Sequence, residues 1–221
     1  MAEYKDLSKF TYEESPLPMK NVGWLGPGLG VQNSGGGVPR SAVVRLKEEA
    51  RRPRSLKLGT HECEFCADSA PEGNGEIHVF GRDGVTYSAP CLVLHYVERH
   101  HYVPPREFIV ALTSPESLVW DSRAETLRSL LANEEADPAW RVNALLSLPD
   151  WDDPRAEQAV VKAAEDDEIS TLAGYELAVS LAVIWLRSRK VNWEIHRRLY
   201  PEAQMQVRDE FSCRRVSLDD L

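Results

Sequence analysis

Two cysteines and two histidines carry the clearest chemistry in this sequence. Cys63 and Cys66 flank two residues, and His95 and His100 follow on one later segment. A closed structural zinc site takes four thiolate or imidazole ligands, and small zinc modules supply them as one pair from a turn and one pair from a helix. The sequence therefore predicts that Cys63, Cys66, His95 and His100 bind zinc.

The fourth ligand has an alternative. Cys91 lies four residues before His95 and would share its face of a helix, but the cysteine pair would then have to lie under the first helical turn. His100 lies five residues after His95, within the spacing that zinc fingers tolerate. We favour His100 and keep Cys91 as the alternative.

Two interpretations without zinc also exist. The cysteines could be free thiols, with His95 a core histidine bonded to a carbonyl group. They could instead form a redox dithiol, although the βαβ pattern that usually surrounds such a pair is missing from the sequence. His61 and His78 are predicted to be surface residues rather than ligands, and Cys213 a free thiol.

A catalytic metal would need an open coordination position and a nearby general base. The adjacent His100 and His101 are distantly similar to the paired histidines of HNH-type nucleases, but those enzymes need a second metal and a basic groove for DNA. The charge balance gives no sign of such a groove. We therefore predict no catalytic residues, favour a role other than that of an enzyme, and keep a metal-dependent hydrolase or nuclease as the alternative.

A hairpin and a short helix are expected to position the four ligands. Residues 76–80 and 85–87 alternate around a turn at 81–84, which predicts a β-hairpin. A helix should begin at residues 89–90 and reach 101, before Pro104 and Pro105 end it. Further helices are expected at 38–50 and 108–112. The basic run at 51–57 favours a solvated connector, with an anion-binding patch as the alternative. These elements predict a zinc-stapled, ββα-containing module.

The same half of the chain, residues 1–113, includes an arm and a loop. Residues 1–20 alternate aromatic and polar types, which favours an extended arm, and Trp24 is predicted to pack in the core. Residues 26–37 are rich in glycine, but no strand precedes them and no Lys-Ser or Lys-Thr pair follows. A flexible loop is therefore predicted rather than a phosphate-binding loop.

Residues 114–221 have a helical pattern throughout. Helices are expected near 122–132, 138–148, 154–165, 169–188 and 192–211. Acidic residues lie in the turns before these helices, where they stabilise helix N-termini through the helix dipole. The unit from Asp137 to Ala163 resembles a HEAT-type helical repeat, and a second, degenerate unit begins near Ile169. The fold class is thus α+β: the zinc-stapled module at 1–113, then an all-α, HEAT-like region at 114–221.

Charge and hydropathy limit the class of protein. The net charge is −9, and residues 114–221 hold 21 acidic against 13 basic side chains, which disfavours nucleic acid as a partner. The longest apolar run, at 177–186, is too short to cross a bilayer, and no secretory signal is recognised, so we predict a cytoplasmic location. We predict a protein-binding role for the acidic helical region, as in an adaptor or an immunity-type protein.

Four motifs in the first half of the chain resemble an uncharacterised bacterial family, chiefly actinobacterial. The family's histidines match His95 and His100, whereas Cys91 falls outside its motif, so the resemblance implies His95 and His100 as ligands. It implies no activity, and residues 26–37 are richer in glycine than the family would suggest. The motifs are Tyr4-Lys5-Asp6-Leu7-Ser8, Asn21-Val22-Gly23-Trp24-Leu25, His61-x-Cys63-x-x-Cys66 and Pro90-x-Leu92-x-x-His95-Tyr96-Val97-x-x-His100-x-Tyr102-x-Pro104-Pro105-x-Glu107-Phe108.

Overall fold

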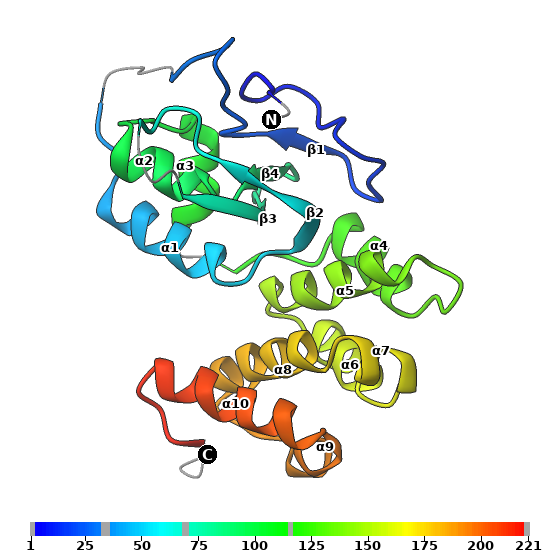
Figure 1. Ribbon diagram of the computed structural model, residues 1–221. Helices are drawn as coiled ribbons and strands as arrows, with labels where there is room; N and C mark the ends of the chain where they lie inside the picture. The colour runs from blue at the N-terminus through cyan, green and yellow to red at the C-terminus, as the bar shows by residue number, and fades with distance from the viewer. Residues whose placement is uncertain (1–2, 32–35, 68–70, 115–116, 219–221) are drawn as a thin grey trace. The chain divides into compact units, whose positions relative to one another are not determined.

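The fold is taken from a computed structural model that describes residues 3–31, 36–67, 71–114 and 117–218. The chain divides into two compact units, Met1–Leu118 and Val119–Leu221. The first unit is built on a small sheet and the second contains only helices among its described residues (Figure 1). Within the described residues, no helix is both long enough and apolar enough to cross a membrane.

The sheet of the first unit has four strands, β1 (Met19–Asn21), β2 (Ser55–Glu62), β3 (Glu72–Phe80) and β4 (Thr86–Pro90). Their order is β1-β4-β3-β2; β2, β3 and β4 are antiparallel, whereas β1 runs parallel to β4. The predicted hairpin is confirmed as β3 and β4, with Val79 opposite Tyr87. The basic run at 51–57, predicted to be a connector, instead enters β2 at Ser55.

Three helices accompany this sheet: α1 (Arg40–Ala50), α2 (Val93–Arg99) and α3 (Arg106–Thr113). The helix predicted to begin at residues 89–90 begins at Val93 instead, because Pro90 pairs with Glu76 at the end of β4 and the Cys91 N–H bonds to the Gly75 carbonyl at 2.8 Å. One set of side chains from β3 and β4 forms a core with the helices, as a period of two predicts. This core includes Leu46, Ile77, Val79, Tyr87, Ala89, Val93, Tyr96, Tyr102 and Phe108.

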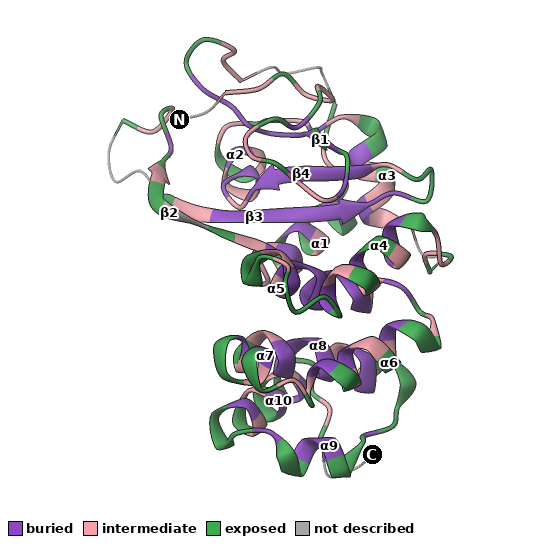
Figure 2. Cartoon of the chain, turned by 90° about the vertical axis from the view of Figure 1, so that its right-hand side faces the viewer, coloured by how far each residue is buried: buried purple, intermediate pink, exposed green. Residues whose placement is uncertain are grey.

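The N-terminal arm packs by aromatic contacts, but turns and bends interrupt the extended conformation that was predicted for it. Phe10, Met19 and Trp24 form a second buried cluster, against which Tyr4 and Tyr12 pack. Trp24 is 2% exposed, which confirms the prediction that it lies in the core. Every residue of β4 is buried, and both central strands are coloured as largely buried in Figure 2. Of the glycine-rich loop at 26–37, residues 32–35 lie outside the described part of the chain.

The second unit contains α4 (Ser122–Leu131), α5 (Pro138–Ser147), a 3-10 turn η1 (Leu148–Asp150), α6 (Pro154–Ala163), α7 (Asp167–Leu172), α8 (Gly174–Ser188), α9 (Trp193–Arg198) and α10 (Pro201–Cys213). The acidic turns are confirmed as helix caps, since the carboxylates of Asp121, Asp137, Asp153 and Asp166 accept backbone N–H groups. Helix capping therefore explains these four of the 21 acidic side chains at 114–221.

The first three helices of this unit match the predicted ones closely. Each of the last two predicted helices, however, is divided into two helices in the structure. The helix expected at 169–188 is broken at Ala173, which has φ −132° and precedes Gly174. The helix expected at 192–211 is broken at residues 199–200, because Pro201 disfavours helical geometry in the residue before it. Helix α8 is buried along most of its length and packs against α5, α6, α7 and α10.

Candidate metal centre

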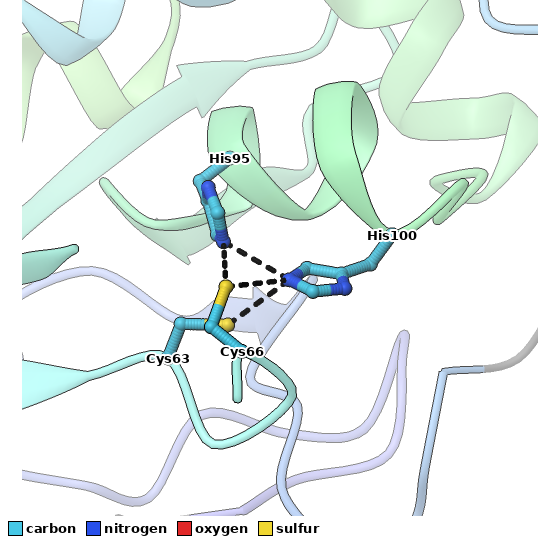
Figure 3. A group of neighbouring side chains, drawn as sticks. All are labelled: Cys63, Cys66, His95 and His100. Atoms are coloured by element: carbon cyan, nitrogen blue, oxygen red, sulfur yellow. Dashed lines mark hydrogen bonds between the residues drawn. The ribbon is translucent and has the colours of Figure 1, made fainter. Parts of the chain in front are cut away.

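The two cysteines lie in a tight turn where β2 ends. Glu62 is the last residue of β2, and the Cys63 N–H bonds to the Pro71 carbonyl at 3.1 Å, which keeps the turn beside the start of β3. The Cys66 N–H reaches the Cys63 carbonyl at 3.5 Å. This turn brings both thiols to one side, facing α2 (Figure 3).

The two histidines come from the body and the end of α2. Positions five apart on a regular α-helix point about 140° away from each other, so His95 and His100 could not share a ligand site if the helix continued. It ends at Arg99, and His100 has φ −116° and ψ 9°, outside helical geometry. His101 then has φ +55°. The helix end is therefore what turns His100 toward His95.

The four ligand atoms lie at distances that suit a tetrahedral ion. His100 Nε2 is 3.2 Å from Cys63 Sγ, 3.4 Å from Cys66 Sγ and 3.0 Å from His95 Nε2, and His95 Nε2 is 3.4 Å from Cys66 Sγ. All four atoms lie within 4.8 Å of one another. Zinc–sulfur bonds of about 2.3 Å and zinc–nitrogen bonds of about 2.0 Å give tetrahedral edges of about 3.3 to 3.8 Å. Four of the six edges, at 3.0 to 3.4 Å, are close to these values and the other two are no longer than 4.8 Å, so this group could hold a metal ion.

The surroundings of the group are partly apolar. Cys63 is buried and the other three residues are half-buried. The ring of Phe65, between the two cysteines in sequence, contacts Tyr96 edge-on, with centroids 5.8 Å apart, and lies 5.6 Å from the His100 ring. This side chain shields one side of the site from solvent.

The titration of two ligands follows from this burial. Burial, and then the neighbouring His100 and Arg99, lower the pKa of His95, so its imidazole is neutral at neutral pH, as metal binding requires. Burial, and then the hydrogen bond and charge of Cys63, raise the pKa of the Cys66 thiol. A bound cation reverses that effect, because a coordinating thiol is deprotonated by its metal.

The alternative ligand, Cys91, lies outside this group of four described residues. It lines a small cavity with Trp24 and Glu76, and burial followed by the charge of Glu76 raises the pKa of its thiol to about 11. Its sulfur faces Gly75, where an added Cβ would lie 2.9 Å from it. The structure thus brings His100, and not Cys91, to the other three residues.

His61 and His78 lie outside the group of four candidate ligands. His61 pairs with Gly73 between β2 and β3, outside the group. The prediction that His78 lies on the surface was wrong: it is 3% exposed on β3, with its Nε2 3.6 Å from Glu76 Oε2. Ser88 donates to the same Glu76 oxygen at 3.2 Å. The alternation of β3 located this side chain on a strand but did not indicate that both faces are covered.

Hydrogen bonds to Asp6 hold Tyr102, which follows His100 by two residues. The Tyr102 hydroxyl donates to Asp6 Oδ2 at 2.8 Å, and Asp6 Oδ1 accepts the Gly23 N–H at 2.8 Å. Burial raises the pKa of Asp6 against the opposing effect of these hydrogen bonds. Sequence reasoning missed this contact, because nothing in the spacing of residues 6, 23 and 102 relates them.

The family described as a domain of unknown function, DUF7919, matches residues 2–113, about half of the chain. The motifs had indicated an uncharacterised family for this half, and the match confirms that much. No curated protein and no solved structure matches the chain.

Proposed function

The chain belongs to the DUF7919 family, and we propose that Cys63, Cys66, His95 and His100 bind one structural Zn²⁺ ion in its family domain. The observation that carries this proposal is the grouping of four ligand atoms from two separate segments of the chain, with four of their six separations between 3.0 and 3.4 Å and all of them within 4.8 Å. Two thiolates and two imidazoles suit zinc, whereas magnesium and calcium prefer oxygen ligands.

A structural role fits the ligand set better than a catalytic one. A catalytic zinc usually has three protein ligands and an open fourth position for water. Here four side chains supply all four positions. Glu98, the acid on α2 between the two histidines, is paired with Lys47, with 2.7 Å between carboxylate and ammonium. These features favour a staple between the β2–β3 end and α2 over a hydrolase or nuclease.

Metal analysis tests this proposal directly. Protein purified without chelators should contain one zinc per chain by elemental mass spectrometry, and Cys63→Ser should lose the zinc and the cooperative unfolding of the domain, because the energy of zinc binding is part of the folding energy. Protein that contains no zinc after purification and does not take it up would refute the site. A folded Cys63→Ser protein that keeps its stability would refute the structural role.

We further propose that the chain acts by binding a protein, as an adaptor or an immunity-type protein would. The support is the second unit, whose helices resemble HEAT-type repeats and carry exposed large apolar side chains at Leu172, Tyr175, Tyr200 and Met205. Affinity capture with the full chain, followed by reconstitution with the purified partner, tests this role. A one-to-one complex that survives nuclease treatment is expected, and recovery of nucleic acid alone would contradict it.

A further inference from the structure

The second unit has a groove between α4 and α6, with a volume of about 620 Å³ and lining residues from 125 to 166. We propose that this groove binds an extended segment of a partner protein and that an acidic side chain of the segment pairs with Lys162. The inference rests on the proposed protein-binding role and assigns it a surface and a ligand chemistry.

The floor of the groove lets a polypeptide backbone come close. Leu131 and Ala163 are buried and Ala159 is half-buried, so the base is apolar and made mainly of small side chains. From Arg155 to Lys162 the helix rises about 10 Å, which three to four residues of an extended chain span at about 3.3 Å each. A short extended segment of three to four residues therefore matches the length of this wall.

One end of the groove is held in place before any ligand binds. Arg155 forms an ion pair with Asp153 at 2.8 Å, and its guanidinium lies 4.4 Å from the ring centroid of Trp120. Arg128 donates to Glu125 from its Nε at 3.1 Å, and Trp120 donates to the same carboxylate. Both arginines are already paired with carboxylates of this unit. They therefore form the wall of the groove and are not assigned to bind an anionic group of the ligand.

The acids at the opposite end are also engaged. Asp166 caps α7 and pairs with the buried guanidinium of Arg141, and Glu165 contacts Arg198 at 3.4 Å. Glu134, beyond the end of α4, is exposed and has no polar partner among the described residues. An acidic side chain of a bound segment is therefore disfavoured at this end.

Between the two ends, Lys162 and Gln158 line the groove, and both are exposed. Within the described part of the chain, neither side chain has an ion-pair or hydrogen-bond partner. A primary amide both donates and accepts hydrogen bonds, as one peptide group requires, and an ammonium group pairs with a carboxylate. This pair thus complements one peptide unit and one acidic side chain on an extended strand.

The charge of the surrounding unit favours a protein segment over a polyanion. Residues 114–221 hold 21 acidic against 13 basic side chains, so nucleic acid or an anionic membrane would be repelled outside the groove. A single carboxylate in an otherwise neutral segment is repelled far less than a polyanion.

Selection from a random peptide display library on the full chain tests the proposal. Enriched peptides should share an acidic residue, and Lys162→Glu should weaken their binding about tenfold, a difference of about 1.4 kcal/mol. The matched control is Lys190→Glu, the same charge reversal at an exposed lysine of this unit outside the groove, which should bind as the wild type does. Replacing the peptide's acid with lysine should restore binding to Lys162→Glu alone.

A second variant addresses the groove itself. Ala159→Arg should fill the groove and prevent peptide binding, with an unchanged melting curve showing that the unit is folded. Peptides that bind wild type and Lys162→Glu equally, peptides whose binding depends only on a free C-terminal carboxylate, or a library without enrichment would each overturn the groove assignment. A reconstituted complex with a protein partner that is insensitive to Lys162→Glu would overturn the groove while leaving the protein-binding role intact.

Discussion

Replacing His100 with alanine should release the metal, whereas replacing Cys91 with alanine should not. Both residues flank α2, and both satisfy the spacing rules of a fourth ligand, so sequence alone leaves them in competition. The structure separates them: His100 Nε2 lies 3.0 to 3.4 Å from the other three ligand atoms, whereas the Cys91 sulfur faces Gly75.

The expected loss can be estimated from the geometry. Structural zinc binds with about 10 to 16 kcal/mol, and four ligands at similar distances contribute about 2.5 to 4 kcal/mol each. Removing His100 should therefore weaken zinc binding about 100-fold to 1,000-fold. Its side chain is half-buried and lies after the last helical residue, so the fold of the zinc-loaded protein should change little. Cys91→Ala should leave the affinity within about threefold of that of the wild type.

A chromogenic chelator that competes for zinc at neutral pH measures this difference. Wild type and Cys91→Ala should compete equally, and His100→Ala should give up its zinc at far lower chelator concentration. Before the chelator is added, circular dichroism of the three zinc-loaded proteins should show the same helix content. The reasoning is refuted if His100→Ala keeps wild-type affinity, or if Cys91→Ala loses the metal.

Three other substitutions test the packing around the site and the caps of the second unit. Gly23→Ala should cost at least about 2 kcal/mol in urea unfolding, because Gly23 has φ +69° and an added Cβ would lie 2.6 Å from Val93 Cγ2; an unchanged midpoint would contradict this. Burial raises the pKa of Asp6, so the folded protein holds that proton more tightly than the unfolded chain does. The stability of the wild type relative to Asp6→Asn should therefore fall as pH rises from about 3.9 through the raised pKa, and a difference independent of pH would rule the effect out. Asp121→Ala should cost about 1 to 2 kcal/mol through the lost N-cap of α4, whereas Asp121→Asn should keep most of the stability.

The ligand group could be predicted from the sequence because its signals are local. Two thiols in a short turn and two imidazoles on one short segment limit where the side chains can point, whatever the rest of the fold does. The helix caps are local in the same way, since Asp153 followed by Pro154 starts a helix with its own carboxylate and a proline that needs no N–H partner. Predictions of such local features stay correct even when the bounds of the neighbouring helices or strands are predicted wrongly.

The errors arose where the answer depended on distant residues. The first residues of β2, which fall in the basic run at 51–57, were predicted to be part of a connector, and only pairing with β3 makes them a strand. His78 was predicted to lie on the surface, since alternation along a strand predicts that one face of the sheet is exposed to solvent. The arm lies beside the edge strand β1, where Lys9 bridges Lys20 and Asn21 donates to Ser8 and to the Lys9 carbonyl.

The end of α2 connects the candidate metal site to this arm. His100 leaves the helix to reach the other ligands, His101 takes up φ +55°, and the Tyr102 hydroxyl then reaches the buried carboxylate of Asp6. A left-handed conformation at a histidine costs about 1 to 2 kcal/mol, and it is kept only where the contacts on both sides outweigh that cost. A metal held by His100 on one side and the hydrogen bond to Asp6 on the other would supply those contacts. The turn with the two cysteines, α2 and the arm are therefore best understood as one structural unit, in which a bound metal would fix the same helix end that the arm contacts through Asp6.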